Sequence, residues 1–267
     1  FDGIFMHTDF FFFFIMDCNN DYIYSDAEAL FSVGKRFLEG DCLEKDPVKA
    51  RDLLSRAASL GHRKAQELLL SMEETPSEDS PEARVWDDMV SGREYDATHP
   101  YLLERLNATK DRIWEYNKMR PSMLKERNEL LRGLLGKSDG DTFINQPFYC
   151  DYGSNIRVGR RFFANFNFTV LDEAPVTVGD DCFIGPNVSI YTACHSTDPV
   201  ERNSRREWAK PVTIGDNVWI GGSVTILPGV TIGSNVTIGA GSVVVKDIPD
   251  GCVAVGNPCR VVKRNIR

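Results

Sequence analysis

The sequence predicts a mainly β fold, a parallel β-helix built from six-residue repeats and preceded by helical segments. From residue 212 to 248 an aliphatic residue recurs at every sixth position, and glycine follows it in four of six cases. These positions are Ile214, Ile220, Ile226, Ile232, Ile238 and Val244. A period of six matches neither the period of 2 of a half-buried strand nor the 3.6 of an amphipathic helix. It is the pattern of hexapeptide solenoids.

The repeat has a simple physical interpretation. Three hexapeptides form one triangular coil, and each coil adds about 4.8 Å along the axis, the ordinary spacing of paired strands. The aliphatic side chains point inward and stack from coil to coil, while the glycines let the chain turn each corner without a Cβ atom. An antiparallel sheet with glycine turns is the alternative, but hairpins with variable loops would not give equal intervals.

The repeat also extends upstream and is interrupted once. Val178, Ile184 and Ile190 continue it in the same phase. An earlier set, offset by two residues near Pro175, consists of Val158, Ala164 and Val170. Between Ile190 and Ile214 the pattern disappears for 24 residues, a multiple of six, in a segment rich in charged residues. We expect a long loop outside the solenoid wall, which is where a rigid scaffold usually carries its function.

Composition bounds the class of protein. The 267 residues are 42% hydrophobic, enough for one core and an accessory module, and the net charge of −8 argues against a nucleic-acid partner. Seven cysteines without CxxC spacing favour reduced thiols in a cytoplasmic protein. The apolar run from Phe10 to Met16 is too short to cross a membrane and lacks the features of a secretion signal. Residues 1–26 are left unassigned, as a segment that need not be folded.

The N-terminal half is helical in pattern. Residues 27–72 have glycines at spacings that resemble a single Sel-like repeat, a helical hairpin. We expect an accessory packing or docking element, with recognition of a protein partner as the alternative. Residues 73–83 are rich in Pro, Ser and acidic residues and are interpreted as a linker. Apolar stripes return in residues 84–137, so these helices should pack on the solenoid of residues 138–267.

Several motifs resemble one known family. MVSGREYDATHPYL is similar to the cap of maltose acetyltransferases, and the segment from QPFYCDYGSN to YTACHSTDPVERN is similar to the core of the family. GNPCRVVK resembles its usual exit from the β-helix. Residues 84–267 thus resemble the maltose and galactoside O-acetyltransferases of the hexapeptide-repeat superfamily. The resemblance implies a left-handed β-helix, a homotrimer with acetyl-CoA between neighbouring subunits, and acetyl transfer to a sugar.

His195 is the candidate general base. It is the only histidine after residue 99 and lies at the start of the interrupting loop. An imidazole with a pKa of about 6.5 can take a proton at neutral pH. The resemblance also places the catalytic histidine of the family here. Cys194 is adjacent, but neighbouring side chains in an extended chain point to opposite sides, so we expect direct transfer rather than an acetylated thiol.

The resemblance supplies candidates for both substrates. Asp96, Asn165 and Glu173 match positions that hydrogen-bond the sugar, although the family often has Asp in place of Glu173, and Asp96 could instead cap a turn. Asp151 stands where relatives can carry Ser. For the cofactor, the resemblance implies the backbone amides of Gly222, as oxyanion donor, and Ala240, the basic residues near the phosphates, and a tryptophan beside the site. The basic residues are Lys246, Arg260 and Lys263, and their alternative role is that of solvated surface charges. The tryptophan is Trp219, for which ordinary packing is the alternative.

Two other functions are compatible with a hexapeptide solenoid. The γ-type carbonic anhydrases share this solenoid but need several histidines for their metal, whereas this solenoid has one, so no metal is expected. A non-catalytic hexapeptide scaffold or assembly subunit stays open, because fold does not fix function. Maltose or glucose is the expected acceptor, with galactosides and chitooligosaccharides as alternatives.

Overall fold

The computed structural model describes residues 26–40, 46–73, 80–139 and 141–264. The chain divides into two compact units, residues 1–77 and 78–267, and each is described by itself. Most of the unassigned segment 1–26, and residues 74–79 of the expected linker, lie outside the described residues.

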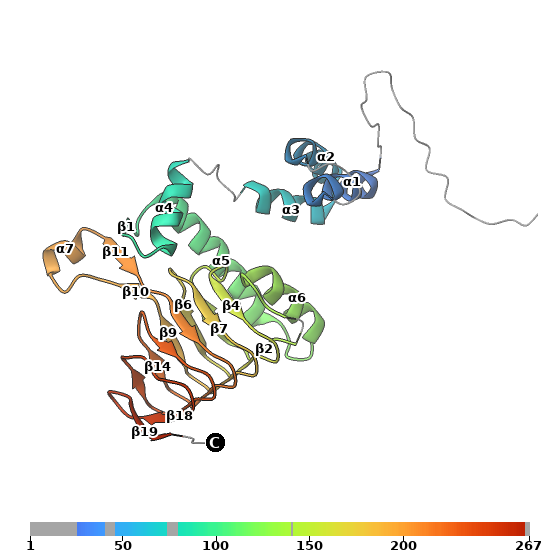
Figure 1. Ribbon diagram of the computed structural model, residues 1–267. Helices are drawn as coiled ribbons and strands as arrows, with labels where there is room; N and C mark the ends of the chain where they lie inside the picture. Colours follow the sequence, from blue (N-terminus) through green and yellow to red (C-terminus); the bar gives the residue numbers. More distant parts are fainter. Residues whose placement is uncertain (1–25, 41–45, 74–79, 140, 265–267) are drawn as a thin grey trace, which may run out of the picture. The chain divides into compact units, whose positions relative to one another are not determined.

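The described part of the first unit contains the helices α1 (Ala27–Glu39), α2 (Pro47–Ser59) and α3 (Arg63–Glu73), shown in Figure 1. Leu30, Phe37 and Leu54 form part of its apolar core. A Cβ atom on Gly34 would lie only 3.0 Å from the Leu54 side chain, so glycine permits α1 and α2 to pack closely. That this helical unit is a Sel-like repeat stays a prediction.

Helices close one end of the solenoid in the second unit. They are α4 (Pro81–Val90), α5 (Pro100–Lys118) and α6 (Leu124–Leu134), with the short strand β1 (Tyr95–Asp96) between α4 and α5. The Tyr116 hydroxyl of α5 donates a hydrogen bond to the Ile144 carbonyl (2.6 Å), and Asn117 exchanges two hydrogen bonds of 2.9 Å with the Phe148 backbone. The helices therefore cover apolar side chains that would otherwise face water at the end of the coil stack.

Three parallel sheets form the walls of the solenoid (Figure 1). The first wall contains β4 (Ile156–Val158), β7 (Val176–Val178), β12 (Val212–Ile214) and β15 (Thr231–Ile232). The second contains β2 (Phe143–Ile144), β5 (Phe163–Ala164), β8 (Phe183–Ile184), β13 (Trp219–Ile220), β16 (Thr237–Ile238) and β18 (Cys252–Val255). The third contains β3 (Phe148–Cys150), β6 (Phe168–Leu171), β9 (Ser189–Tyr191), β14 (Thr225–Ile226) and β17 (Val243–Val244).

The inward stacking predicted from the six-residue period is confirmed. Ile220 pairs in register with Ile184 of the preceding coil and Ile238 of the following coil, and all three are buried. The glycine at the corner is required by the close approach of the next coil. A Cβ atom on Gly221 would lie 2.6 Å from the backbone nitrogen of Ala240, a distance too short for any side chain.

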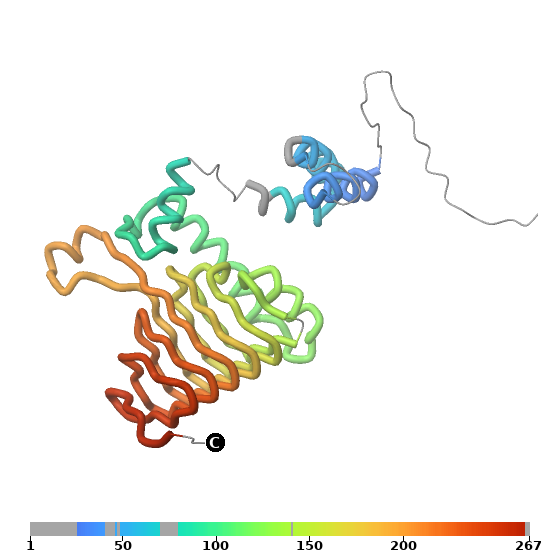
Figure 2. The backbone as a smooth tube through the Cα atoms, in the orientation of Figure 1, coloured from blue at the N-terminus to red at the C-terminus, as the bar shows by residue number. Residues whose placement is uncertain are grey.

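The segment that interrupts the repeat is a structured hairpin that leaves the coils, as Figure 2 shows. It consists of β10 (Ala193–Cys194), the short helix α7 (Pro199–Asn203) and β11 (Arg206–Ala209). Strand β11 pairs antiparallel with β10 on one side and with β1 on the other. The hairpin is thereby attached to the helical cap. The sequence predicts only a loop outside the solenoid wall and not this attachment.

The opposite end of the solenoid is closed by β19 (Arg260–Arg264), which pairs antiparallel with β18. No helix in the described ranges has the length and apolar character needed to span a bilayer.

Candidate active site

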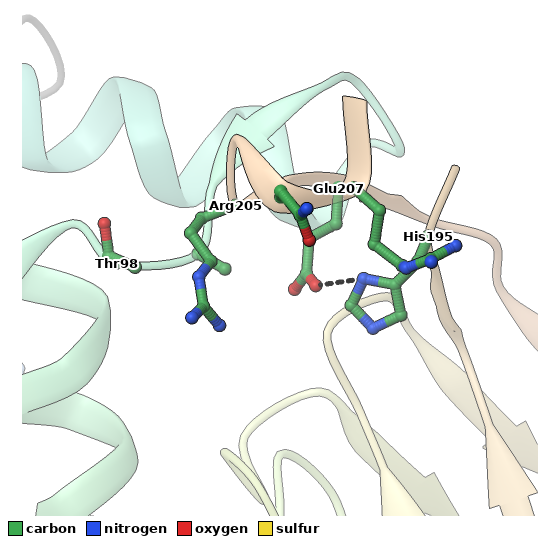
Figure 3. Close-up of a pocket in the computed structure, with 7 residues that line it drawn as sticks. Thr98, His195, Arg205 and Glu207 are labelled. Atoms are coloured by element: carbon green, nitrogen blue, oxygen red, sulfur yellow. Dashed lines mark ion pairs between the residues drawn. The ribbon is translucent and has the colours of Figure 1, made fainter. Parts of the chain in front are cut away.

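His195 is exposed at the end of β10, and its ring is held from one side. Its Nδ1 atom lies 3.0 Å from Oε2 of Glu207, whose side chain is only 11% exposed (Figure 3). The other carboxylate oxygen of Glu207 accepts a hydrogen bond from the hydroxyl of Tyr95, which is buried in β1. The three side chains form a continuous chain from the cap through the hairpin to the exposed imidazole.

The protonation states follow from this geometry. Burial raises the pKa of Tyr95 far above its usual value, and the hydrogen bond to Glu207 raises it further, so Tyr95 stays neutral and donates. A carboxylate can only accept, so the imidazole must place its proton on Nδ1 to bond to Glu207. Nε2 of His195 is then left with a free lone pair, as a general base requires.

A second group of carboxyls, Asp151, Asp172 and Glu173, lies near these three side chains in the turns that follow β3 and β6. Burial raises the pKa of Glu173 to about 9, with the charge of Asp151 as the next cause. A hydrogen bond of 3.2 Å joins Glu173 Oε2 to the hydroxyl of Thr192. Burial also raises the pKa of Asp172 to about 7, although its Oδ1 accepts from the backbone N–H groups of Asp151 and Tyr152. Burial and the neighbouring Asp151 therefore favour the protonated form of Glu173, which can donate a hydrogen bond.

Asp96 lies next to Tyr95 and makes contacts typical of a turn cap. Its Oδ1 accepts from the backbone N–H (2.8 Å) and the hydroxyl (2.7 Å) of Thr98, and these bonds lower the pKa of Asp96. The turn-cap alternative therefore describes the contacts of Asp96 within this chain. Binding of a sugar by Asp96 stays a prediction.

Five of the candidate residues line two cavities. The first, of about 480 Å³, is lined by His195 and Glu207, by Ala97 and Thr98 of the cap, and by residues of α7 and the turn after it (Figure 3). The second, of about 470 Å³, lies over the second wall at a corner of the coils. Its lining includes Asn165, Trp219, Gly222 and Ala240.

Some candidates are thus brought together and others are not. Asn165 lines the corner cavity, whereas Glu173 lies with Asp151 in the other group, so the expected sugar ligands are divided between two places. Lys246, Arg260 and Lys263 are exposed and line neither cavity. Their assignment to the cofactor phosphates stays a prediction.

The corner cavity offers two free backbone donors. Among the described residues, the N–H groups of Gly222 and Ala240 have no hydrogen-bond partner. At the matching corner of the first wall, the N–H of Asp216 donates instead to the Ser234 hydroxyl (3.0 Å), which belongs to the next coil. Ala240, at the equivalent position of the next coil, has no side-chain acceptor for the Gly222 N–H, and the Ala240 N–H also meets no acceptor in the described residues. Both donors remain available to a ligand carbonyl.

Glu207 and Tyr95 are not among the residues predicted from the sequence. Their signal is the pairing of the hairpin: β10 and β11 pair Ala193 with Ala209 and Cys194 with Trp208, so the next position places His195 opposite Glu207. Without that register, Glu207 cannot be distinguished from the other charged residues of the segment.

The described residues contain no group of three His, Cys, Asp or Glu side chains suited to hold a metal ion. The expectation that the reaction uses no metal stays a prediction.

Comparison with known protein families gives three matches. Residues 88–140 match the maltose acetyltransferase hexapeptide capping motif, and residues 211–246 match the bacterial transferase hexapeptide (six repeats). Residues 175–193 match the hexapeptide repeat of succinyl-transferase.

Individual proteins give the same result. The galactoside O-acetyltransferase of Escherichia coli is 44% identical over 162 residues, which are 61% of this chain and 80% of that protein. The crystal structure of a maltose O-acetyltransferase from Clostridium difficile has 46% identity and a TM-score of 0.68, covering 68% of this chain and 98% of the other. A galactoside acetyltransferase in complex with coenzyme A has 39% identity and a TM-score of 0.66, covering 68% and 91%. The solenoid is the left-handed β-helix of hexapeptide repeats.

Proposed function

Because this chain belongs to the maltose and galactoside O-acetyltransferases of the hexapeptide-repeat superfamily, we propose that it transfers an acetyl group from acetyl-CoA to a sugar hydroxyl. His195 is the general base. The observation that carries this assignment is the exposed imidazole with a free Nε2, held through Nδ1 by the buried carboxylate of Glu207. A non-catalytic scaffold subunit would not require the buried Tyr95 and Glu207 to orient one exposed histidine.

The residues account for each proton. Nε2 of His195 takes the proton of the sugar hydroxyl while its oxygen attacks the thioester carbonyl. Glu207 stabilises the imidazolium that forms. When the tetrahedral intermediate collapses, the C–S bond breaks and the imidazolium returns the proton to the leaving sulfur. The products are the O-acetyl sugar and coenzyme A, and His195 is neutral again.

The corner cavity is suited to the donor. The free N–H of Gly222 would bind the oxyanion of the tetrahedral intermediate, and that of Ala240 would bind an amide carbonyl of the pantetheine arm. Trp219, which is 59% exposed, provides an apolar wall for the same arm. Coenzyme A bound to a related acetyltransferase supports acetyl-CoA as the donor.

The two cavities need a second copy of the chain to act together. Within one chain, His195 does not line the corner cavity that contains Gly222, although direct transfer requires the base and the thioester to meet. Three chains around a threefold axis would place the hairpin of one subunit against the corner of its neighbour. Each subunit then contributes one wall of each cleft, and Asn165 reaches the sugar from the neighbour.

Direct attack is favoured over an acetylated thiol. Cys194 is partly buried, and burial raises the pKa of its thiol, which keeps it in the unreactive neutral form. The observed contact of its sulfur is to the Thr192 carbonyl, 3.7 Å away.

The experiment is an acceptor panel. Thiol release from acetyl-CoA should rise in the presence of maltose, glucose or a galactoside, and mass spectrometry should show a gain of one acetyl group on the sugar. Unchanged thiol release with every sugar would support the non-catalytic scaffold instead.

A further inference from the structure

The cavity beside His195 is basic along one edge. Arg202 and Asn203 belong to α7, Arg205 follows in the turn before β11, and all three line the cavity with His195 and Glu207. In Figure 3 the guanidinium of Arg205 lies in the space between Thr98 on one side and the His195–Glu207 pair on the other. The proposed reaction gives Arg205 no task.

Arg205 has a backbone conformation that favours glycine. Its φ angle is 65°, in the left-handed region that is unfavourable for a residue with a side chain. Both sides of its peptide backbone are fixed, because its N–H donates to the Arg202 carbonyl (3.2 Å) and its carbonyl accepts from Ala97 N–H (3.1 Å). A strained position that carries a long charged side chain at a cavity suggests that the side chain is used.

The charge of Arg205 is not balanced within the part of the chain that the structure describes. Among the residues that the structure describes, its guanidinium has no hydrogen-bond or ion-pair partner. Both oxygens of Glu207 are occupied by Tyr95 and His195. Arg161 is a useful contrast, since it also has a positive φ but is paired with Asp181.

Neighbouring groups do not compensate for it. Arg206 pairs with Glu94, and the Nη1 atom of Arg202 donates to the Ser196 carbonyl (3.1 Å), which carries no net charge. The cavity that contains the base therefore presents two guanidinium groups and no free carboxylate in the described chain. A planar guanidinium binds two oxygens of a carboxylate, phosphate or sulfate group at once.

We propose that Arg205, supported by Arg202, binds an anionic group of the acceptor, so that the preferred substrates are acidic sugars. This inference rests on the proposed function. It adds that the hydroxyl presented to His195 belongs to a sugar that carries a carboxylate, phosphate or sulfate group.

The test compares matched acceptors. Values of kcat/KM are measured for glucose, glucuronate and glucose 6-phosphate, at saturating acetyl-CoA, with wild type, Arg205→Gln, Arg205→Lys and Arg205→Gly. For the wild type, at least one acidic sugar should exceed glucose by about tenfold or more, the usual value of one charge-assisted hydrogen bond. Glucuronate and glucose 6-phosphate distinguish a carboxylate from a phosphate group.

The variants separate charge from folding. Arg205→Gln and Arg205→Gly should reduce the ratio of acidic to neutral kcat/KM about tenfold or more, and Arg205→Lys should reduce it less. Because glycine suits a φ of 65°, Arg205→Gly should fold at least as stably as the wild type. Arg206→Gln changes the net charge equally, one residue further along and outside the cavity lining, and should leave the ratio unchanged.

Two results would overturn the inference. One is a wild type that acetylates glucose as well as either acid, with no effect of Arg205→Gln on the ratio. The other is an increase in the KM of acetyl-CoA in Arg205→Gln with an unchanged acceptor ratio, which would assign the guanidinium to the donor. If no sugar of either kind is acetylated, the proposed function fails, and the inference fails with it.

Discussion

Tyr95 and Glu207 lie opposite each other in the antiparallel pair of β1 and β11, and the hydroxyl of Tyr95 donates a hydrogen bond to the Glu207 carboxylate. They are 112 residues apart in the sequence. The second oxygen of the same carboxylate meets Nδ1 of His195 at 3.0 Å. The cap therefore holds the carboxylate that orients the proposed base, and a change in the cap should alter catalysis without touching a substrate.

Tyr95→Phe should lower kcat with little change in the KM of either substrate. The variant removes one hydrogen bond to a buried carboxylate, a loss of about 1.5–3 kcal/mol in such cases, and it loosens the orientation of His195. We expect kcat to fall about tenfold and the Tm to fall by several degrees. Tyr149→Phe is the control, because Tyr149 is 49% exposed and lies outside both cavity linings. A Tyr95→Phe protein with wild-type kcat would show that the Tyr95 hydroxyl does not position the base.

Glu207→Gln should be more damaging. Glutamine keeps the shape of the side chain but lacks the charge that stabilises the imidazolium, and its amide can face Nδ1 with either its oxygen or its nitrogen. We expect kcat to fall by about 100-fold, within the usual contribution of general base catalysis, while circular dichroism stays unchanged. Steady-state kinetics with the best acceptor measure it. A fall of less than threefold would mean that the carboxylate serves only the fold.

The solenoid could be predicted from the sequence, but the hydrogen-bonded series of Tyr95, Glu207 and His195 could not. The inward position of Ile220 can be predicted from the six-residue repeat. Ile220 stacks on Ile184 and Ile238 of the neighbouring coils, and this stacking requires an aliphatic residue at each repeat position. Glu207 belongs to no repeat. Its place beside His195 and Tyr95 results from the pairing of β11 with β10 and with β1, which is far away in the sequence. Such a register leaves no periodic signal in the sequence. His195 could be found from the loop and the family resemblance, but the partners on its Nδ1 side could not.

Proline substitutions can remove single backbone donors at the corner cavity. Pro186 occupies the position after the corner glycine on one coil, where the coils above it have Gly222 and Ala240, so proline is compatible with this corner. Gly222→Pro should lower kcat about 100-fold if its N–H is the oxyanion donor. Ala240→Pro should raise the KM of acetyl-CoA by about 2- to 10-fold, the value of one neutral hydrogen bond.

The control for both proline variants is Gly222→Ala, which adds a methyl group and keeps the N–H. It should retain most of its kcat. Because a Cβ atom at position 222 would lie 3.2 Å from the Pro186 carbonyl oxygen, the two Gly222 variants should have the same Tm, and Ala240→Pro should have a Tm close to that of the wild type. If Gly222→Ala is as inactive as Gly222→Pro, bulk rather than a lost donor is responsible, and the assignment of the oxyanion donor is wrong.

Glu173 should make stability depend on pH. Its pKa is raised by burial to about 9 in the folded protein, from a usual value of 4.5, so between these pH values the folded state binds more protons than the unfolded state. Its contribution to stability is then fully present below pH 4.5 and is lost as the pH rises through about 9. Glu173→Gln resembles the protonated acid and does not suffer this loss.

Thermal unfolding at a fixed protein concentration tests this prediction. The Tm of the wild type minus that of Glu173→Gln should decrease by about 2–4 °C or more between pH 5 and pH 9, since about 1 kcal/mol shifts the Tm of such a protein by that amount. Glu126→Gln, a change at an exposed residue of α6, is the control. A difference that is constant with pH would show that Glu173 is ionised in the folded protein.

The most direct test of the central claim is the rate of acetyl transfer by His195→Ala at saturating acetyl-CoA and acceptor. We predict that kcat falls by about 10²- to 10⁴-fold, the range for loss of a general base, while the variant still binds coenzyme A with the affinity of the wild type. A His195→Ala protein that acetylates the same sugar within threefold of the wild-type rate would contradict the assignment of the base.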